Sequence, residues 1–511
     1  MTDEGPISGE ESAVPVLGSA DRAFRFAVVF FVVGIFLGSA FPSVMFPVIL
    51  FSVFVAIATA GIFPGRRSLR FALIACSISF GMLLATREES EWGRGRKPVE
   101  ISGVADIVRK PEDLEYAVST VVRIVSCDSD SCPPESVEVR FPVGSPVSYG
   151  DRGVFACRLE PVDADFRMWY ATRNIAYRCR DPEWAYTGTT RPVRSALFRV
   201  SSRFETSLMR YLPEPESGLA AGLILGGDKR LPEEVREGFR NAGLTHIVAV
   251  SGYNISIIAE YLLFFGILLT LPRRRAAPFA LLGTAGFVFI AGAPPSATRA
   301  LCMAGTLMLA QWFGRRYESL FALVFVAALM LLFDPLLLFH DVGFQLSFLA
   351  TAGIVLSSSL VGRMTRHVPK IASPFLEAFL ITIAANLLLV PILLSGFGRF
   401  VPTAIPVNTI LLPLVPLSML LSFLVGLFGT FSSVLGTMSS FPAYAALHVI
   451  IEGARFGASF GDMAVETDRF GWGPAFLWYG TLASLFFLIR RKRVPEAARD
   501  GGSVSSVDMG E

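Results

Sequence analysis

Apolar residues run in long blocks along most of this chain, and polar residues gather in one middle segment and in short loops. Twelve blocks approach the ~20 apolar residues that a helix needs to cross the hydrocarbon core of a bilayer, although several are short enough to be broken or re-entrant. The pattern predicts a polytopic α-helical membrane protein with about twelve spans. The blocks are 24–41, 44–63, 69–86, 245–271, 278–292, 296–313, 319–333, 345–362, 374–396, 403–429, 433–452 and 472–490.

The middle segment carries a different pattern between residues 97 and 190. Short runs rich in valine and isoleucine, such as ISGVADIV, SVEVRFPV and RGVFACRLEP, are separated by proline, glycine, aspartate and serine. Short β-branched runs bounded by turn residues are typical of strands. We therefore expect a small β-barrel or sandwich, inserted between two groups of membrane helices.

Residues 191–244 connect this β-module to the next apolar block. The stretch VRSALFRVSSRFETSLMRYL places apolar residues at helical spacing with arginines between them, which predicts an amphipathic helix. The stretch GLAAGLILGGDKRLPEEVREGFRNAG predicts a helix, a turn and a second short helix that ends at Gly243. This helix–turn–helix is either a surface linker or the mouth of the following span.

Composition and charge placement support a membrane protein. The chain is 52% hydrophobic and only 17% charged, which excludes an ordinary soluble domain, while the net charge of +2 indicates no particular partner. Arginines and lysines cluster in alternate loops, and such loops are expected to be cytoplasmic. The first 23 residues, the loops at 64–70, 273–276 and 362–370, and the tail at 491–511 then lie inside the cell. The helices at 24–86 precede an external β-module, and the protein belongs in the cytoplasmic membrane.

Four of the six cysteines lie in the β-module, at Cys127, Cys132, Cys157 and Cys179. Clustered cysteines in an exported module favour disulfides. The pairing Cys127–Cys132 with Cys157–Cys179 is one of three connectivities, and four unpaired cysteines remain an alternative.

Several polar residues interrupt the apolar blocks. Polar groups are costly in lipid and usually face a cavity or a protein partner, and helix breakers beside them are tolerated where they line such a site. Some have simpler interpretations: His246 as a core histidine, the asparagines as interhelical hydrogen-bonding groups, and Arg299 and Asp341 as a pair. The candidates for a polar path are His246, Ser251, Gly252, Asn254, Arg299, Asp341, Gln345, Asn386, Arg399 and Asn408.

No catalytic, cofactor or metal motif is found in the sequence. The four histidines are far apart, and neither a phosphate-binding loop nor a G-x-S-x-G turn is present. We therefore expect no enzyme activity, no cofactor and no metal site, although Ser251 and His246 leave a serine hydrolase conceivable.

The polar segments together resemble the ComEC-type competence family. The stretch GLAAGLILGGDKRLPEEVREGFRNAGLTHIVAVSGYNIS is similar to that family's hallmark sequence. GAPPSATRA, GFQLSF, AANLLLVPILLSGFGRF and VNTILLPLVPL follow in the family's order. The resemblance covers roughly residues 218–490, and more weakly 24–190, which is similar to the family's N-terminal spans and external OB-like domain.

The resemblance implies a channel that passes single-stranded DNA across the cytoplasmic membrane during natural transformation. It further implies contact with membrane lipid and, as partners, an external DNA receptor, a cytoplasmic helicase and a separate nuclease. The alternatives are a transporter or flippase of another polar substrate, and a membrane scaffold that transports nothing.

Two departures from the family pattern matter. Asn254 stands where the family commonly has a histidine. Many members also carry a C-terminal metallo-β-lactamase-like domain, whereas only 21 residues follow Arg490 here. Strand degradation is therefore expected to come from another protein.

A DNA path also needs cations, because each nucleotide carries a negative charge. The β-module is not basic, since 97–190 holds eleven Lys/Arg against fifteen Asp/Glu. We therefore expect Arg299 to be the principal phosphate contact, in a hydrated cavity shared with His246, Ser251, Asn254, Asp341 and Gln345. Aromatic residues that could stack on bases, or pack in the core, are Tyr116, Phe141, Tyr149, Phe155, Trp169 and Tyr170.

Overall fold

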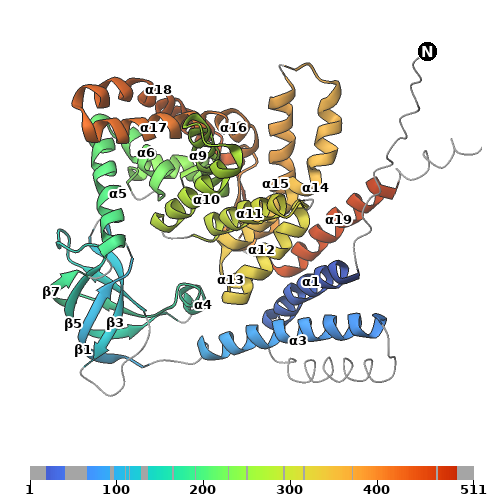
Figure 1. Cartoon of the computed structure of the whole chain (residues 1–511), viewed down its shortest axis with the longest axis horizontal. Coiled ribbons are helices and arrows are strands. Elements are labelled where there is room, and N and C mark those ends of the chain that lie inside the picture. The colour runs from blue at the N-terminus through green and yellow to red at the C-terminus, as the bar shows by residue number, and fades with distance from the viewer. Residues whose placement is uncertain are drawn as a thin grey trace, which may run out of the picture. The chain divides into compact units, whose positions relative to one another are not determined.

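The computed structural model divides the chain into two compact units (Figure 1). The first unit comprises Met1–Arg96, Ala164–Arg173 and Phe321–His340, and the second comprises the rest. The residues that the structure describes are 19–40, 66–92, 97–109, 111–113, 116–127, 136–163, 166–189, 192–227, 230–248, 251–291, 294–314, 317–370, 372–467 and 470–491.

Two long helices dominate the first unit. Helices α1 (Ser19–Ala40) and α3 (Arg66–Trp92) lie side by side (Figure 1). Their backbones approach closely, because a Cβ atom added at Gly34 would overlap the backbone of Ile78. Small residues at such contacts are typical of membrane helices. The unit also contains α4 (Arg167–Ala171), α13 (Leu337–His340) and nearly all of α12 (Ser319–Phe333).

The second unit begins with a closed β-barrel. The hydrogen-bonded order β1–β3–β4–β6–β5 returns to β1, so five strands close the barrel. Outside this circuit, β2 pairs with β3 and β7 pairs with β5. Neighbours in the circuit are antiparallel except β4 and β6, which are parallel. The strands are β1 (Val99–Ile107), β2 (Glu112–Asp113), β3 (Val118–Cys127), β4 (Ser136–Phe141), β5 (Asp151–Pro161), β6 (Ile175–Arg180) and β7 (Glu183–Thr189).

The barrel core follows from the alternation of side chains along each strand. Val137 and Val139 of β4 are fully buried, and Phe155 and Leu159 of β5 are at most 1% exposed. The expectation of a small β-barrel in this region is therefore confirmed, and Phe155 belongs to its core.

The rest of the second unit is helical. Two short strands, β8 (Arg399–Phe400) and β9 (Val465–Glu466), pair with each other beside the helices. The helices are α5 (Pro192–Tyr211), α6 (Glu216–Leu225), α7 (Glu233–Asn241), α8 (Thr245–Val248), α9 (Gly252–Leu268), α10 (Arg273–Ile290), α11 (Pro295–Trp312), α14 (Val342–Met364), α15 (Ser373–Phe397), α16 (Ala404–Leu411), α17 (Leu414–Phe431), α18 (Ser433–Ala458) and α19 (Trp472–Arg491).

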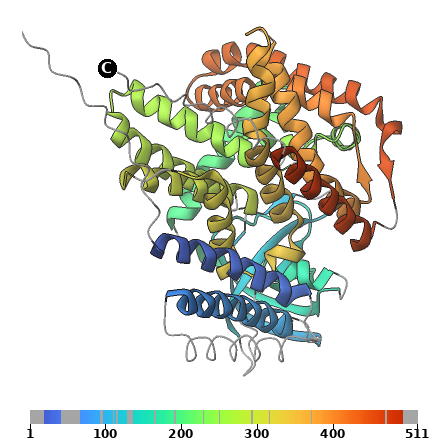
Figure 2. The same ribbon diagram turned by 90° about the vertical axis from the view of Figure 1, so that its right-hand side faces the viewer.

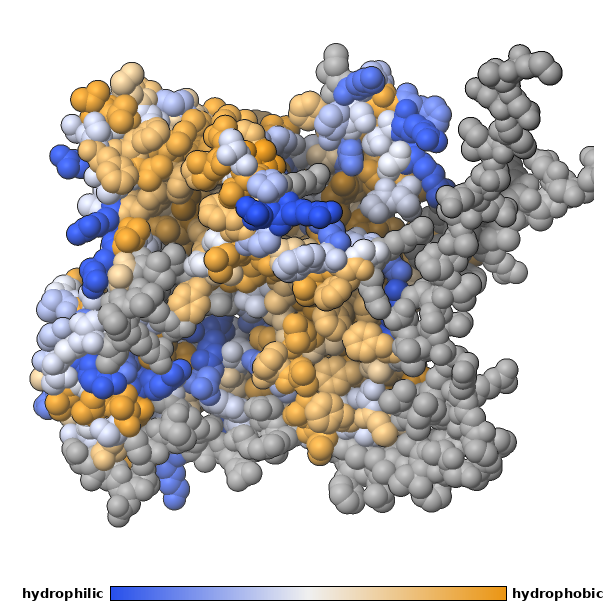
Figure 3. All heavy atoms as spheres, viewed as in Figure 1, coloured by the Kyte–Doolittle hydropathy of each residue, from blue (hydrophilic) through white to orange (hydrophobic). Residues whose placement is uncertain are grey.

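Large apolar side chains cover much of the helical surface. In Figure 3 the face over α17 and α18 is mainly orange, whereas the face over the β-barrel is mainly blue and white. Exposed apolar surface of this extent is expected where helices meet lipid. Among the described residues, the helical stretches long and apolar enough to cross a membrane are five: Thr245–Leu268, Val342–His367, Ser373–Phe397, Leu414–Phe431 and Ser433–Ala458.

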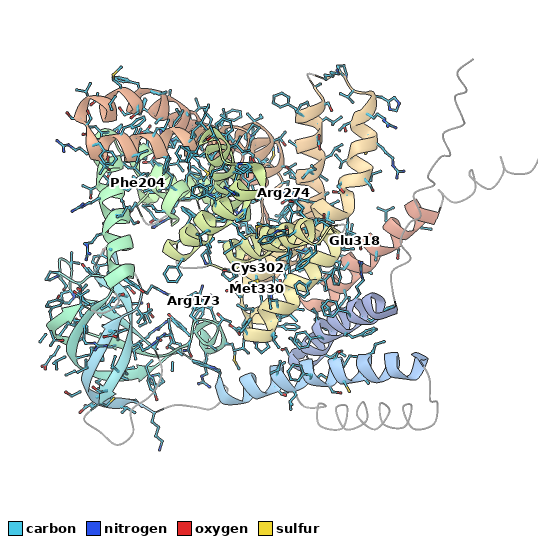
Figure 4. The ribbon with its side chains drawn as sticks, in the orientation of Figure 1. Arg173, Phe204, Arg274, Cys302, Glu318 and Met330 are labelled. Atoms are coloured by element: carbon cyan, nitrogen blue, oxygen red, sulfur yellow. A yellow bond between two sulfur atoms is a disulfide. The ribbon has the colours of Figure 1, made fainter. Side chains whose placement is uncertain are left out.

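Close packing holds the amphipathic helix α5 against the bundle. Phe204 of α5 (Figure 4) lies 5.8 Å from Phe423 of α17, measured between ring centres. A Cβ atom added at Gly426 would overlap the Phe204 ring. Helices α17 and α18 themselves lie side by side in both views (Figures 1 and 2). The prediction of an amphipathic helix before the bundle therefore matches α5.

The helices agree with the predicted apolar blocks except at two breaks. The block 403–429 is divided into α16 and α17, because Pro413 separates them. The block 245–271 is divided into α8 and α9. The block 44–63 lies outside the described residues, so the number of twelve spans stays a prediction.

Candidate functional site

The side chain of Arg299 is buried where α9, α11 and α14 meet in the apolar bundle. Helix α11 begins directly after Pro294, and Pro295 occupies its first position, where a fixed φ and a missing N–H favour helix initiation. Arg299 therefore lies one turn inside the helix, and it is only 8% exposed.

Groups from all three helices surround the guanidinium. Its Nη1 donates to the hydroxyl of Thr351 on α14 and lies 3.9 Å from the sulfur of Met303. Its carbon lies 5.8 Å from the ring centre of Phe348. On the α9 side, a Cβ atom added at Gly252 would overlap Nη2, so glycine leaves the space that the guanidinium occupies.

The charge of Arg299 has no carboxylate partner in the described part of the chain. No ion pair there includes Arg299, and its buried Nε has no hydrogen-bond partner. An uncompensated buried charge is costly, so a charged residue kept in such a place is a candidate for function. The arrangement can therefore accept an anion that brings its own negative charge.

The possible pairing of Arg299 with Asp341 is not formed. Asp341 is the N-cap of α14, and its Oδ1 accepts a hydrogen bond of 2.7 Å from the Phe344 amide. A carboxylate at this position satisfies an exposed backbone donor and favours the helix dipole. Asp341 therefore caps its own helix, and the described residues show no ion pair between it and Arg299.

A second polar cluster lies at the start of α9. Ser251 is the N-cap, and its Oγ accepts from the Asn254 amide at 3.2 Å. The Asn254 side chain is 1% exposed; its Oδ1 accepts from Ser251 Oγ at 3.1 Å, and its Nδ2 donates to Leu223 O of α6 at 3.5 Å. Asn254 thus connects the start of α9 to the last turn of α6. These hydrogen bonds explain why this span begins with polar residues.

Two other members of the predicted cavity, His246 and Gln345, lie on different helices. His246 is exposed on the short helix α8, and Gln345 is half-buried in the first turn of α14. The structure therefore joins Arg299 with Gly252, and Ser251 with Asn254. A single cavity shared by all six residues stays a prediction.

The remaining candidates have local environments of their own. Asn386 Nδ2 donates to Thr382 O within α15 at 2.9 Å. Asn408 of α16 is 4% exposed, and its Oδ1 has no hydrogen-bond partner among the described residues. These observations leave Asn408, but not Asn386, with an unused polar atom in the protein interior.

Arg399 differs from Arg299 because it is held by protein groups. Its Nη1 donates to Asn241 Oδ1 at 2.9 Å, and its Nε lies 3.3 Å from Glu466 Oε1. Arg399 and Glu466 are also partners in the β8–β9 ladder. Arg399 therefore connects this two-stranded sheet to α7. Of the two arginines, Arg299 is the one without a carboxylate beside it in the described part of the chain.

Sequence reasoning missed three residues that contact Arg299. Met303 lies four positions further along α11, and this spacing places the two side chains on one helical face. Phe348 belongs to the quoted GFQLSF motif, and Thr351 follows one turn later. The helical period alone marks Phe348 and Thr351 as neighbours, but not their contact with another helix.

We expect Gly252→Ala to lower the DNA uptake that the resemblance implies, while leaving the protein folded. The new methyl group would occupy the place of Arg299 Nη2, and a flexible guanidinium would move instead of the backbone. Uptake by Gly252→Ala cells is compared with uptake by Gly305→Ala cells. Gly305 lies on α11 with open space around its Cβ position, so it is the matched control. Equal uptake by the two variants would show that the guanidinium position is unimportant.

The barrel cysteines lie on neighbouring strands. The structure joins Cys157 of β5 to Cys179 of β6, whose Cα atoms lie 6.3 Å apart. Cys127 is disulfide-bonded as well, and Cys132 lies outside the described residues. The free cysteines in the described part of the chain are Cys76 and Cys302.

We expect non-reducing mass spectrometry of the extracted protein to find a peptide pair joined through Cys157 and Cys179. The sulfur atoms are adjacent across two paired strands, in a module expected to face an oxidising compartment. Alkylation of four thiols within residues 97–190, before any reduction, would contradict this result.

Metal-ligating side chains do not cluster in the described ranges. Groups of three or more His, Cys, Asp or Glu placed to hold an ion are absent among these residues.

Comparisons with known proteins agree with the resemblance of the motifs. The model of the family described as "Competence protein" matches residues 223–492, which is more than half of the chain and includes Arg299. The chain is 29% identical over 202 residues to ComE operon protein 3 of Bacillus subtilis (strain 168), and the alignment covers 40% of this chain and 25% of that relative. The match thus spans about a quarter of the relative's length, and no solved structure matches the chain. Because the family model matches more than half of the chain, the chain belongs to the competence protein family.

Proposed function

We propose that this protein is the membrane channel that passes single-stranded DNA across the cytoplasmic membrane during natural transformation. The observation that carries the proposal is the buried Arg299, which has no carboxylate beside it among the described residues and lies within the family's matched region. A nucleic-acid strand supplies a phosphate at every nucleotide, so each passing phosphate can compensate this charge in turn.

Arginine suits this task better than lysine. Its guanidinium keeps its charge in apolar surroundings and presents a planar fork to phosphate oxygens. Thr351 and Met303 hold Nη1, while Nε has no partner among the described residues. A moderate number of protein contacts also favours release, because a channel site must bind weakly enough for its substrate to leave.

We further propose that the barrel is an OB-like domain that receives the strand outside the membrane. Its closed circuit of five strands, with one parallel pair, supports this assignment. Such barrels bind single strands by stacking bases on exposed aromatic rings. Phe141, Tyr149 and Tyr170 are buried, whereas Tyr116 is 82% exposed and Tyr186 is 61% exposed. Tyr116 and Tyr186 are therefore the better stacking candidates on the barrel.

The proposal includes a topology and a set of partners. Both termini lie in the cytoplasm and the barrel lies outside. The transported strand comes from an external DNA receptor and is drawn inward by a cytoplasmic helicase. A separate nuclease degrades the other strand, because the proposed channel performs no chemistry itself.

We expect a single cysteine at position 274 to resist labelling from outside intact cells. Arg274 (Figure 4) is exposed at the start of α10, and its basic neighbours indicate a cytoplasmic loop. An impermeant maleimide is applied to cells whose protein lacks the native cysteines. A cysteine at position 116 in the barrel is the control that should be labelled readily. Ready labelling at position 274 would invert the topology.

Strand binding by the purified protein tests the function itself. We expect single-stranded DNA to bind with an affinity that falls as salt rises, since phosphate contacts release counterions. Binding of duplex DNA with the same affinity, or no salt-dependent strand binding, would favour a transporter of another polar substrate or a scaffold.

A further inference from the structure

A cleft of about 620 Å³ lies between the β-barrel and α5. Its barrel wall includes Ser145, Ser148 and Thr189. Its other wall includes Arg199 and Arg203 of α5 and Arg230 of the turn before α7. The volume falls within the ~300–1,000 Å³ typical of small-ligand sites, so it can hold a nucleotide.

Two of these arginines have no acidic partner among the residues that the structure describes. Arg199 and Arg203 lie four positions apart and therefore on one face of α5, and both are exposed. No ion pair in the described ranges includes either residue. Like charges at this spacing disfavour the helix, unless an anion compensates them.

The third arginine is fixed by a buried carboxylate. Arg230 Nε lies 2.5 Å from Glu205 Oε1, and the Glu205 side chain is 8% exposed. This ion pair positions Arg230 at the cleft, and each of the two residues neutralises the charge of the other. The other carboxylate of the lining, Asp151, accepts from the Ser148 amide at 2.7 Å and so belongs to a barrel turn.

The cleft therefore differs in charge from the barrel beside it. The lining has three arginines and two engaged carboxylates, whereas residues 97–190 carry more acidic than basic side chains. The cations come from α5 and from the turn before α7, not from the barrel. A negatively charged strand is thus attracted to the junction of barrel and helix more than to the barrel surface in general.

We infer that this cleft binds the phosphate backbone of single-stranded DNA as the strand leaves the barrel. Arg199 and Arg203, four residues or ~6 Å apart along the helix axis, contact neighbouring phosphates, and the polar barrel wall, with Ser145, Ser148 and Thr189, faces the sugars and bases. The inference rests on the proposed function and assigns it a second phosphate site, outside the bundle. Anionic lipid headgroups offer the same phosphate chemistry, and the test below distinguishes the two occupants.

The test measures binding of a fluorescent oligothymidylate to the full-length purified protein over a salt series. We expect Arg199→Gln/Arg203→Gln to raise Kd at least tenfold at low salt. The slope of log affinity against log salt should fall by ~0.7 for each phosphate that the variant no longer neutralises. Arg210→Gln is the matched control: Arg210 lies on the same helix, contacts the Tyr211 ring and does not line the cleft. It should change Kd less than twofold.

The charge-preserving variant Arg199→Lys/Arg203→Lys separates binding from misfolding, and we expect it to keep most of the affinity and slope. Unchanged strand binding by the glutamine variant would overturn the inference while leaving the channel proposal standing. Absence of salt-dependent strand binding by the unmodified protein would overturn both. Unchanged strand binding together with lost binding of a soluble short-chain phosphatidylglycerol would reassign the cleft to lipid.

Discussion

Arg299→Ala is expected to abolish DNA uptake while the protein still inserts and folds. Removing one partner of a buried charged interaction costs about 2–5 kcal/mol, and each 1.4 kcal/mol corresponds to about a tenfold change in binding. Strand passage should therefore fall by about 25-fold to a few thousandfold. Arg299→Lys should restore only part of it, because a single ammonium cannot reproduce the guanidinium fork.

Thermal unfolding of the purified variant distinguishes this function from a structural role. Removal of a buried charge without a carboxylate partner relieves a desolvation cost, so Arg299→Ala should be at least as stable as the unmodified protein. The exposed Arg363 of α14 provides the control, and Arg363→Ala should retain uptake. A large loss of stability in Arg299→Ala would instead make the residue a structural one.

Gly353→Leu is expected to destabilise the bundle and to reduce uptake indirectly. A Cβ atom at Gly353 of α14 would lie 2.7 Å from the Ala384 carbonyl oxygen of α15, which is backbone and cannot move aside. The two helices would separate, at a cost of about 1–3 kcal/mol or more. Gly353 lies two residues from Thr351, so the support of Arg299 would shift with it.

Gly362→Leu is the matched substitution on the same helix. Gly362 is exposed, and a Cβ atom there meets nothing within 4 Å. Unfolding of both variants in detergent should show a loss of stability for Gly353→Leu alone. Equal stability of the two variants would mean that α14 and α15 do not pack as closely as the structure indicates.

The apolar pattern predicted the helices well because a bilayer demands long apolar runs of nearly constant length. Short strands of alternating burial likewise predicted the barrel. The pattern failed at helix breaks. Pro413 ends one apolar run in its middle, and Ser251 caps a new helix where the sequence suggested one continuous span. Both breaks leave composition unchanged, so hydropathy could not locate them.

The candidate site was predictable in part. Arg299 stood out because a charged residue is rare within apolar blocks. Its neighbours did not, since Thr351 and Met303 are ordinary residues that acquire importance only when α11 and α14 meet. Asp341 was misassigned as a charge partner because a sequence does not show whether a carboxylate caps its own helix. Contacts between distant helices are set by packing, which single-sequence patterns do not contain.

Photo-crosslinking beside Arg299 during uptake tests the central claim most directly. A benzophenone amino acid is placed at position 303, next to the guanidinium, in competent cells where uptake is stalled by a bulky block on the DNA end. Position 309 on the same helix is 47% exposed on the apolar surface and serves as the control. We expect a crosslink to single-stranded DNA from position 303 and none from position 309. Efficient uptake without a crosslink from position 303 would show that the strand does not pass Arg299.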